Sequence, residues 1–86
     1  MEKYNFNMSI PCDINKHNAK SICNKLSNFN SDIYISKNDD FRRYSAKSRL
    51  GLISLDINKS DNVNIEVYGF EDEFENIESA FNLPIS

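Results

Sequence analysis

The segment Asp13–Ala19 combines the residue types of an anion-binding turn with the only histidine of the chain. Asn15 is well suited to cap a helix there, and the free N–H groups at a helix start bind anions together with the positive end of the helix dipole. A histidine at the cap position could accept a phosphoryl group that those N–H groups would stabilise. The side-chain carbonyl of Asn15 can instead accept hydrogen bonds from the N–H groups of His17 or Asn18, but its amide is no nucleophile for phosphoryl transfer. The turn is therefore either an altered phosphate site or an ordinary helix cap.

The histidine itself, His17, is expected in the first turn of this helix with its ring toward solvent. Only Asp13 is near enough in the sequence to orient the ring, and a lone surface histidine without an orienting carboxylate rarely acts in catalysis. As an imidazolium it would still pair with a phosphate or an acidic partner, and Lys16 and Lys20 would add to the positive field. Phosphotransfer through His17 stays open as an alternative.

A second candidate site is the serine of Lys47-Ser48-Arg49. A serine that caps a helix between two basic residues, followed by exposed apolar Leu50 and Ile53, is typical of a phosphorylation switch, because added negative charge is favourable at a helix start. The simpler alternative is that Ser48 only caps the helix and that Leu50 and Ile53 belong to the core.

Length and charge limit the classes of function. The 86 residues are expected to form a single domain, residues 1–86, with one small core. With 13 acidic and 10 basic residues the net charge is −3, which argues against direct binding of nucleic acid. Basic residues concentrate in 16–25 and 42–49, whereas the last third is acidic. A basic face and an acidic end are expected, and they suit an acidic or phosphorylated protein partner.

The two cysteines, Cys12 and Cys23, are too few for a disulfide scaffold, and neither has a metal partner at a useful spacing. Cys23 falls at an apolar helical position and is expected in the core, whereas Cys12 is expected to be partly exposed. There is no signal peptide and no long apolar run, so the cytosol is the expected compartment. We expect no metal, no cofactor and no membrane contact.

Hydrophobic periodicity predicts the elements that position these residues. Alternating apolar residues predict strands near 4–10, 32–36, 41–45 and 62–68. Apolar residues three and four apart predict helices near 16–28, 50–55 and 70–81, the last with the aromatic stripe Phe70, Phe74 and Phe81 and a stop at Pro84. Each strand has one apolar face and each helix one apolar stripe, so a mostly antiparallel sheet covered on one side by helices is the economical α+β fold.

Three segments together resemble the HPr family, the small phosphocarriers of the bacterial sugar phosphotransferase system. They are Phe29-Asn30-Ser31-Asp32-Ile33, the segment Lys47-Ser48-Arg49-Leu50-Gly51-Leu52-Ile53-Ser54-Leu55, and Val63-Asn64-Ile65. The serine segment is the most specific, because the family has Lys-Ser-(Ile/Leu)-(Met/Phe)-Gly-(Leu/Val)-(Met/Leu)-Ser-Leu there. The resemblance covers nearly the whole chain and implies an open-faced β-sandwich, with four antiparallel strands under three helices in the order βαββαβα.

The resemblance also implies what each site residue replaces. Family members carry Gly-Ile-His-Ala-Arg-Pro-Ala before the first helix, and the histidine accepts a phosphoryl group from enzyme I. In this chain Asn15 stands at that histidine, His17 at the arginine and Asn18 at the proline. Sliding the register by two residues would bring His17 onto the family histidine, but it would put the apolar stripe of the helix out of phase with Phe29 and Ile33. We reject that alignment.

Ser48 matches the family serine that a dedicated kinase, HPr kinase, phosphorylates in many Gram-positive bacteria, after which the protein serves as corepressor for a transcription regulator. Leu50 and Ile53 match exposed apolar docking positions of the family, and Arg49 departs from the usual apolar residue. The segment between the second and third strands is about two residues longer than usual. The chain is similar in outline to catabolite-repression HPr, a branch that also lacks the histidine and retains the serine.

The resulting hypothesis is a regulatory protein-interaction module that is neither an enzyme nor a histidine phosphocarrier. Its partner-binding residues are predicted to be Asn15, Lys16, His17, Lys20, Lys47, Arg49, Leu50 and Ile53. The implied partners are enzyme I, HPr kinase or a transcription regulator. The alternatives are a non-standard phosphocarrier that uses His17 and a diverged scaffold domain unrelated to sugar transport.

Overall fold

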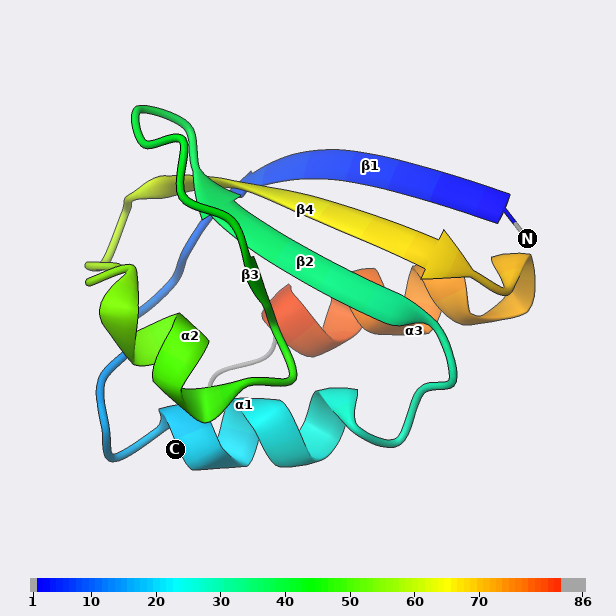
Figure 1. Cartoon of the computed structure of the whole chain (residues 1–86), viewed down its shortest axis with the longest axis horizontal. Helices are drawn as coiled ribbons and strands as arrows, with labels where there is room; N and C mark the ends of the chain where they lie inside the picture. Colours follow the sequence, from blue (N-terminus) through cyan, green and yellow to red (C-terminus); the bar gives the residue numbers. More distant parts are fainter. Residues whose placement is uncertain (1, 83–86) are drawn as a thin grey trace.

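The computed structural model describes residues 2–82 and contains one antiparallel sheet with three helices on one of its faces (Figure 1). The elements follow in the order β1 (Glu2–Ser9), α1 (Ala19–Leu26), β2 (Asp32–Lys37), β3 (Tyr44–Ser45), α2 (Arg49–Ser54), β4 (Asn62–Gly69) and α3 (Glu71–Asn82). The strand order across the sheet is β1-β4-β2-β3. The predicted fold class and the predicted order of elements are confirmed.

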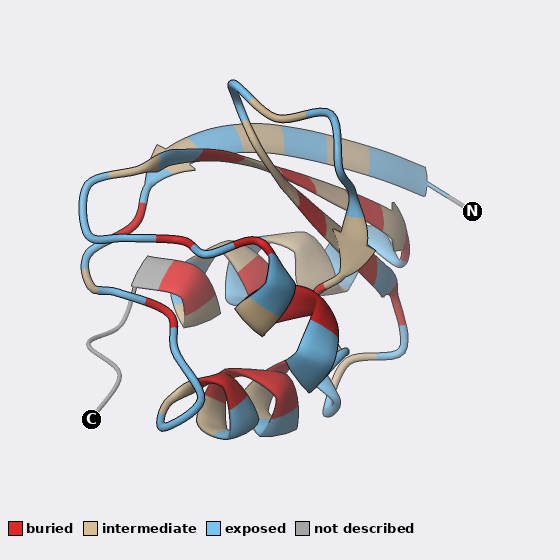
Figure 2. Ribbon diagram, turned by 60° about the vertical axis from the view of Figure 1, so that its left-hand side comes forward, coloured by how far each residue is buried: buried red, intermediate tan, exposed pale blue. Residues whose placement is uncertain are grey.

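In the sheet, β4 pairs with the two other long strands, β1 and β2. In β1, Phe6 faces Ile65 of β4, and on the other side Ile35 of β2 faces the same residue. Because successive side chains on a strand point to opposite faces, this register places the apolar residues of all three strands on the helical side of the sheet. In Figure 2 intermediate residues accordingly alternate with exposed ones along β1, and buried residues alternate with intermediate ones along β4.

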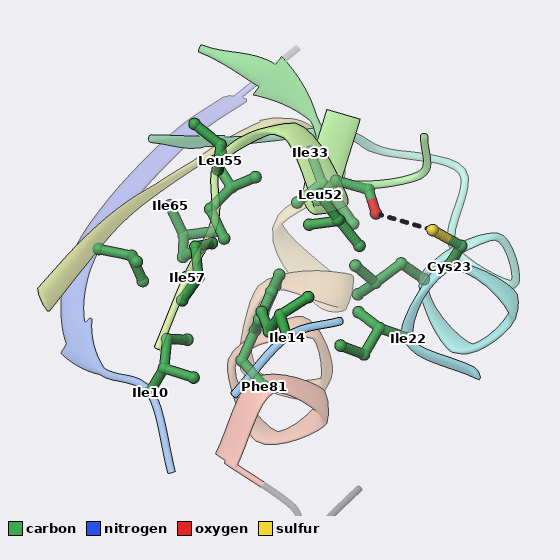
Figure 3. Packing of buried hydrophobic residues seen from close by; sticks show 14 of the residues in the cluster. Ile10, Ile14, Ile22, Cys23, Ile33, Leu52, Leu55, Ile57, Ile65 and Phe81 are labelled. Atoms are coloured by element: carbon green, nitrogen blue, oxygen red, sulfur yellow. Dashed lines mark hydrogen bonds between the residues drawn. The ribbon is translucent and has the colours of Figure 1, made fainter. Parts of the chain in front are cut away.

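One core fills the space between sheet and helices (Figure 3). Ile22 and Cys23 of α1, Leu52 of α2 and Ile77 of α3 are all buried there. The connecting segments contribute as well, since Ile10, Ile14, Leu55 and Ile57 are also buried. No buried side-chain nitrogen or oxygen in residues 2–82 lacks a hydrogen-bond partner.

The predicted third strand is too long, because residues 41–43 are not part of the sheet. The backbone N–H of Arg42 donates to Asp40 Oδ1 at 2.9 Å, so it is turned away from β2. The Arg42 guanidinium also pairs with Asp40 and donates to the carbonyl of Ser54 at 3.0 Å. Phe41, which precedes Arg42, is 98% exposed, whereas the Arg43 guanidinium pairs with Glu66 of β4 and lies over the Tyr34 ring of β2.

The limits of other elements also differ from the predictions. The first strand ends at Ser9, one residue before buried Ile10, and α1 is shorter than 16–28 at both ends. α1 ends early because the N–H groups of Asn28 and Phe29 bond three residues back, to the carbonyls of Lys25 and Leu26, so the α-helical pattern stops there.

The predicted aromatic stripe of the last helix is wrong at Phe70. This residue precedes α3, and its side chain is 52% exposed, whereas Phe74 packs against the core and Phe81 is buried. Phe74 also stacks on Tyr4 of β1, with 5.2 Å between the ring centroids. The predicted stop at Pro84 lies outside the described residues.

Candidate functional site

Two asparagines close the turn that begins α1 through reciprocal hydrogen bonds. Asn15 Oδ1 accepts from the N–H groups of His17 at 2.8 Å and Asn18 at 3.3 Å, and Asn18 Oδ1 accepts from the N–H of Asn15 at 2.9 Å. This is the arrangement of a capping box, with asparagine in the place of the usual glutamate. The prediction that Asn15 caps the helix itself is wrong, because α1 begins at Ala19 with Asn18 as its N-cap residue, and Asn15 caps the turn of residues 16–18 that leads into it. We call this pair of residues the amide clasp.

The amide clasp occupies the groups that an anion would use. The N–H of Ala19 donates to the carbonyl of Asn15 at 2.9 Å, as in any helix. The N–H groups of Asn15, His17 and Asn18 all donate to amide oxygens of the clasp. An incoming phosphate would have to displace Asn15 Oδ1 before it could use the positive end of this helix.

Asn18 has a structural role in this turn that was not predicted from the sequence. Its Nδ2 donates to the carbonyl of Asp13 at 2.6 Å, which ties the helix start to the preceding loop. The asparagine three positions after a capping asparagine is the signal that could have revealed it. Cys12, half-buried as expected, lies beside it with its sulfur 4.0 Å from Asn18 Nδ2.

His17 lies in the turn before α1 and not in the first turn of the helix as predicted, but it is exposed as predicted. Asp13 does not orient the ring, because its Oδ1 accepts a hydrogen bond from the backbone N–H of Lys59 at 2.6 Å. Within residues 2–82 the imidazole takes part in no hydrogen bond or ion pair. Lys16 and Lys20 are exposed as well, so the start of α1 presents a positive surface around a neutral clasp.

Ser48 caps α2, as predicted. Its Oγ accepts from the N–H of Gly51 at 3.1 Å, and its backbone is extended, with φ −97° and ψ 115°. Gly51 is needed at this position because a Cβ there would lie 2.8 Å from the Cβ of Tyr44. The Ser48 side chain is exposed, so a phosphate could be attached without breaking the core.

Leu50 and Ile53, the two apolar candidates on α2, differ in their exposure to solvent. Leu50 is 72% exposed, whereas Ile53 is half-buried and packs against the core. Leu52 and Leu55 are fully buried and occupy the inward face of this segment. Leu50 is therefore the apolar residue of α2 that is most available to a partner.

Helices α1 and α2 pack side by side, which brings the two candidate segments onto neighbouring elements (Figure 1). Cys23 Sγ donates to the carbonyl of Ala46 at 3.7 Å, at the approach to α2 (Figure 3). Burial raises the pKa of the Cys23 thiol, and the nearby charge of Arg49 opposes that shift in part. Arg49 itself is exposed.

Lys47 differs from the other predicted partner-binding residues. Its side chain is half-buried, and Nζ donates to the carbonyl of Phe29 at 2.7 Å. The charge of Lys47 thus already has a partner in the loop between α1 and β2. Arg49 and Leu50, which follow Ser48 directly, are the exposed members of this segment.

Comparison with known proteins identifies the class to which this fold and this site belong. The family model described as PTS HPr component phosphorylation site matches residues 4–83, so the chain belongs to the HPr family of the phosphotransferase system. A search of curated protein sequences gives no match.

Solved HPr structures share the fold at low sequence identity. The phosphocarrier protein HPr from Bacillus anthracis str. Ames aligns with a TM-score of 0.81 and 21% identity over 95% of this chain and 96% of that one. HPr-C-His from Thermoanaerobacter tengcongensis aligns with a TM-score of 0.69 and 21% identity, covering 99% of this chain and 100% of that one. A mycoplasma histidine-containing phosphocarrier protein aligns with a TM-score of 0.72 and 20% identity, covering 90% of each chain.

Residues 2–82 contain neither a helix that could cross a membrane nor a cluster of metal-ligating side chains. No helix there is long and apolar enough to span a bilayer. In the same residues no three side chains of His, Cys, Asp or Glu are grouped so that they could hold a metal ion.

Proposed function

We propose that this member of the HPr family is a regulatory binding protein of the phosphotransferase system and not a histidine phosphocarrier. The observation that carries the proposal is the amide clasp. Asn15 stands at the family phosphohistidine, its amide is no nucleophile, and the surrounding N–H groups already donate to Asn15 and Asn18. The scaffold that would present the phosphoryl group is kept, while the acceptor is missing.

The binding surface is the exposed side of the α1 start and of α2, and it acts in the cytosol on proteins of the phosphotransferase and catabolite-control type. Lys16, His17, Lys20 and Arg49 supply positive charge, and Leu50 supplies an exposed apolar contact. A positive surface around an apolar side chain favours an acidic protein partner such as enzyme I, HPr kinase or a transcription regulator.

Phosphorylation of Ser48 regulates this surface. A phosphate on Oγ would place a dianion at the start of α2, where the N–H of Gly51 now meets the hydroxyl, and next to the exposed Arg49. The added charge offsets the positive charge of Arg49 beside Leu50, so it changes which partner binds without changing the fold.

The experiment incubates the chain with enzyme I and phosphoenolpyruvate, and separately with HPr kinase and ATP, and locates any phosphate by mass spectrometry. We expect no label in the first reaction and a label at Ser48 in the second, which Ser48→Ala removes and the matched control Ser54→Ala keeps. Asn15→His is expected to gain label from enzyme I, because it restores the nucleophile on an intact scaffold.

Label on the wild-type chain in the first reaction would refute the proposal. If that label were lost in His17→Ala, the chain would be a non-standard phosphocarrier that uses His17. Absence of label in both reactions, with no binding to enzyme I or HPr kinase by calorimetry, would favour a diverged scaffold domain unrelated to sugar transport.

A further inference from the structure

The turn between β4 and α3 carries a partly exposed aromatic ring, which lines a shallow surface hollow with three acidic residues at its rim. Phe70 is 52% exposed and lines a surface hollow of about 730 Å³ with Glu2, Gly69, Glu71 and Asp72. Apolar atoms make up most of its wall. In Figure 1 this turn lies at the right-hand end of the sheet, whereas α1 begins at the left-hand end. The hollow is therefore separate from the surface proposed above.

Phe70 is exposed because a rigid turn holds it there. Its N–H donates to Ser31 Oγ at 2.9 Å, and its carbonyl accepts from the N–H of Glu73 at 2.9 Å. Gly69 packs so closely against the start of β2 that a Cβ on it would lie 2.7 Å from the Cα of Ser31. A ring on a backbone fixed in this way loses little conformational freedom when a partner binds it.

The carboxylates of the hollow are unpaired. Of the acidic residues in the first turn of α3, Glu73 bonds to Ser31 and Asn30, whereas Glu71 and Asp72 form no hydrogen bond or ion pair with residues 2–82. The helix dipole favours acidic residues at this position, but it does not account for an exposed ring in an apolar hollow between them. Within residues 2–82 no basic residue lines the hollow.

We propose that this hollow is a docking site for a basic segment of a partner protein. An arginine or lysine of that segment lies over the Phe70 ring and pairs with Glu71, Asp72 or Glu2, and a neighbouring apolar side chain fills the hollow. Charge complementarity selects this occupant, because three carboxylates and, among the described residues, no basic side chain line the hollow around the ring. This docking site shares no residue with the surface of α1 and α2, so it is additional to the proposed function.

The test follows the amide resonances of the full chain by NMR during titration with a capped peptide of alternating arginine and leucine. We expect saturable shifts at Gly69, Phe70, Glu71 and Asp72, and none there with a peptide that has glutamate in place of arginine. The affinity should fall at least about tenfold between about 0.05 M and 0.5 M salt, because the charge pairs at the rim are exposed.

Two variants decide whether the hollow is responsible. Phe70→Ala and the double variant Glu71→Gln/Asp72→Asn should each weaken the peptide at least about tenfold, while the matched control Glu75→Gln keeps the wild-type affinity. Unchanged amide shifts of Ser31 in the variants show that the turn stays folded.

Equal affinities in wild type and variants, or shifts spread over all acidic residues, would refute the docking site. Shifts at this turn that appear with protein concentration alone would assign the hollow to a second copy of the chain and would equally overturn a basic partner. None of these outcomes bears on phosphorylation of Ser48 or on binding through α1 and α2.

Discussion

Glu73 should be the most important charged residue for the stability of this fold, and Glu73→Gln tests that expectation. Its carboxylate accepts hydrogen bonds from the hydroxyl of Ser31 at 2.7 Å, the N–H of Ser31 at 2.9 Å and the N–H of Asn30 at 3.0 Å. Ser31 is completely buried, so its polar groups depend on this partner. The contact joins α3 to the loop before β2 and also fixes the turn that carries Phe70.

The magnitude follows from the number and type of these bonds. Hydrogen bonds to a charged group contribute about 1.5–3 kcal/mol each and neutral ones about 0.5–1.5 kcal/mol. The glutamine keeps the shape and one acceptor oxygen of Glu73, but its NH₂ group would face a backbone N–H that also donates. We therefore expect Glu73→Gln to lower the free energy of unfolding by about 2 kcal/mol, which lowers Tm by about 8–16 °C in a domain of this size.

The pH dependence gives the prediction a second readout. Burial raises the pKa of the Glu73 carboxyl, but the hydrogen bonds from Ser31 and Asn30 and the charge of Lys47 outweigh burial, so the pKa is lowered overall. A carboxyl with a lowered folded-state pKa stabilises the fold above its unfolded pKa of about 4.3, and that stabilisation is lost as the pH falls through the folded-state pKa. The difference between wild type and Glu73→Gln should be complete at pH 7 and shrink below about pH 4.

The assay is urea unfolding at several pH values, with Glu75→Gln as the matched control. Glu75 is exposed in the same helix and makes no hydrogen bond or ion pair with residues 2–82, so its substitution should change the free energy of unfolding by less than about 0.5 kcal/mol. Equal effects of the two substitutions, or a gap between wild type and Glu73→Gln that stays constant to pH 3, would refute the reasoning.

Three further substitutions test local contacts and conformations of the backbone, and urea unfolding measures the change in the free energy of unfolding for each. Gly69→Ala should cost about 2–3 kcal/mol, because the new Cβ would overlap Ser31; a cost below about 0.5 kcal/mol would contradict the close packing. Asn15→Ala should cost about 1 kcal/mol through loss of the cap on the turn before α1, and an unchanged midpoint would argue against the cap. Ser60→Gly should stabilise the fold by about 0.5 kcal/mol, because the φ of 76° at Ser60 is strained for serine and not for glycine. The control Ser79→Gly, inside α3, should destabilise the fold by a similar amount. A change of the same sign in both variants would rule out relief of strain.

Much of the fold could be predicted from the sequence because its signals are local. Alternation in β1 and β4 and the three- and four-residue spacing in α1 depend only on near neighbours in the chain, and both periodicities survive in the structure. The capping hydrogen bonds of Asn15 and Ser48 were predictable for the same reason, since each side chain accepts from an N–H two or three residues further on.

The sequence also determined what chemistry the α1 turn can offer, because position 15 holds an asparagine, whose amide is no nucleophile. The tertiary structure decided what the sequence left open. In the folded protein β3 is only two residues long, and the Lys47 ammonium group donates to the carbonyl of Phe29. Phe70 lies before α3, in an exposed turn. The tertiary structure also joins Glu73 to Ser31 across 42 positions of the chain. Contacts over such separations arise only when the helices pack on the sheet, and no local pattern of residues encodes them.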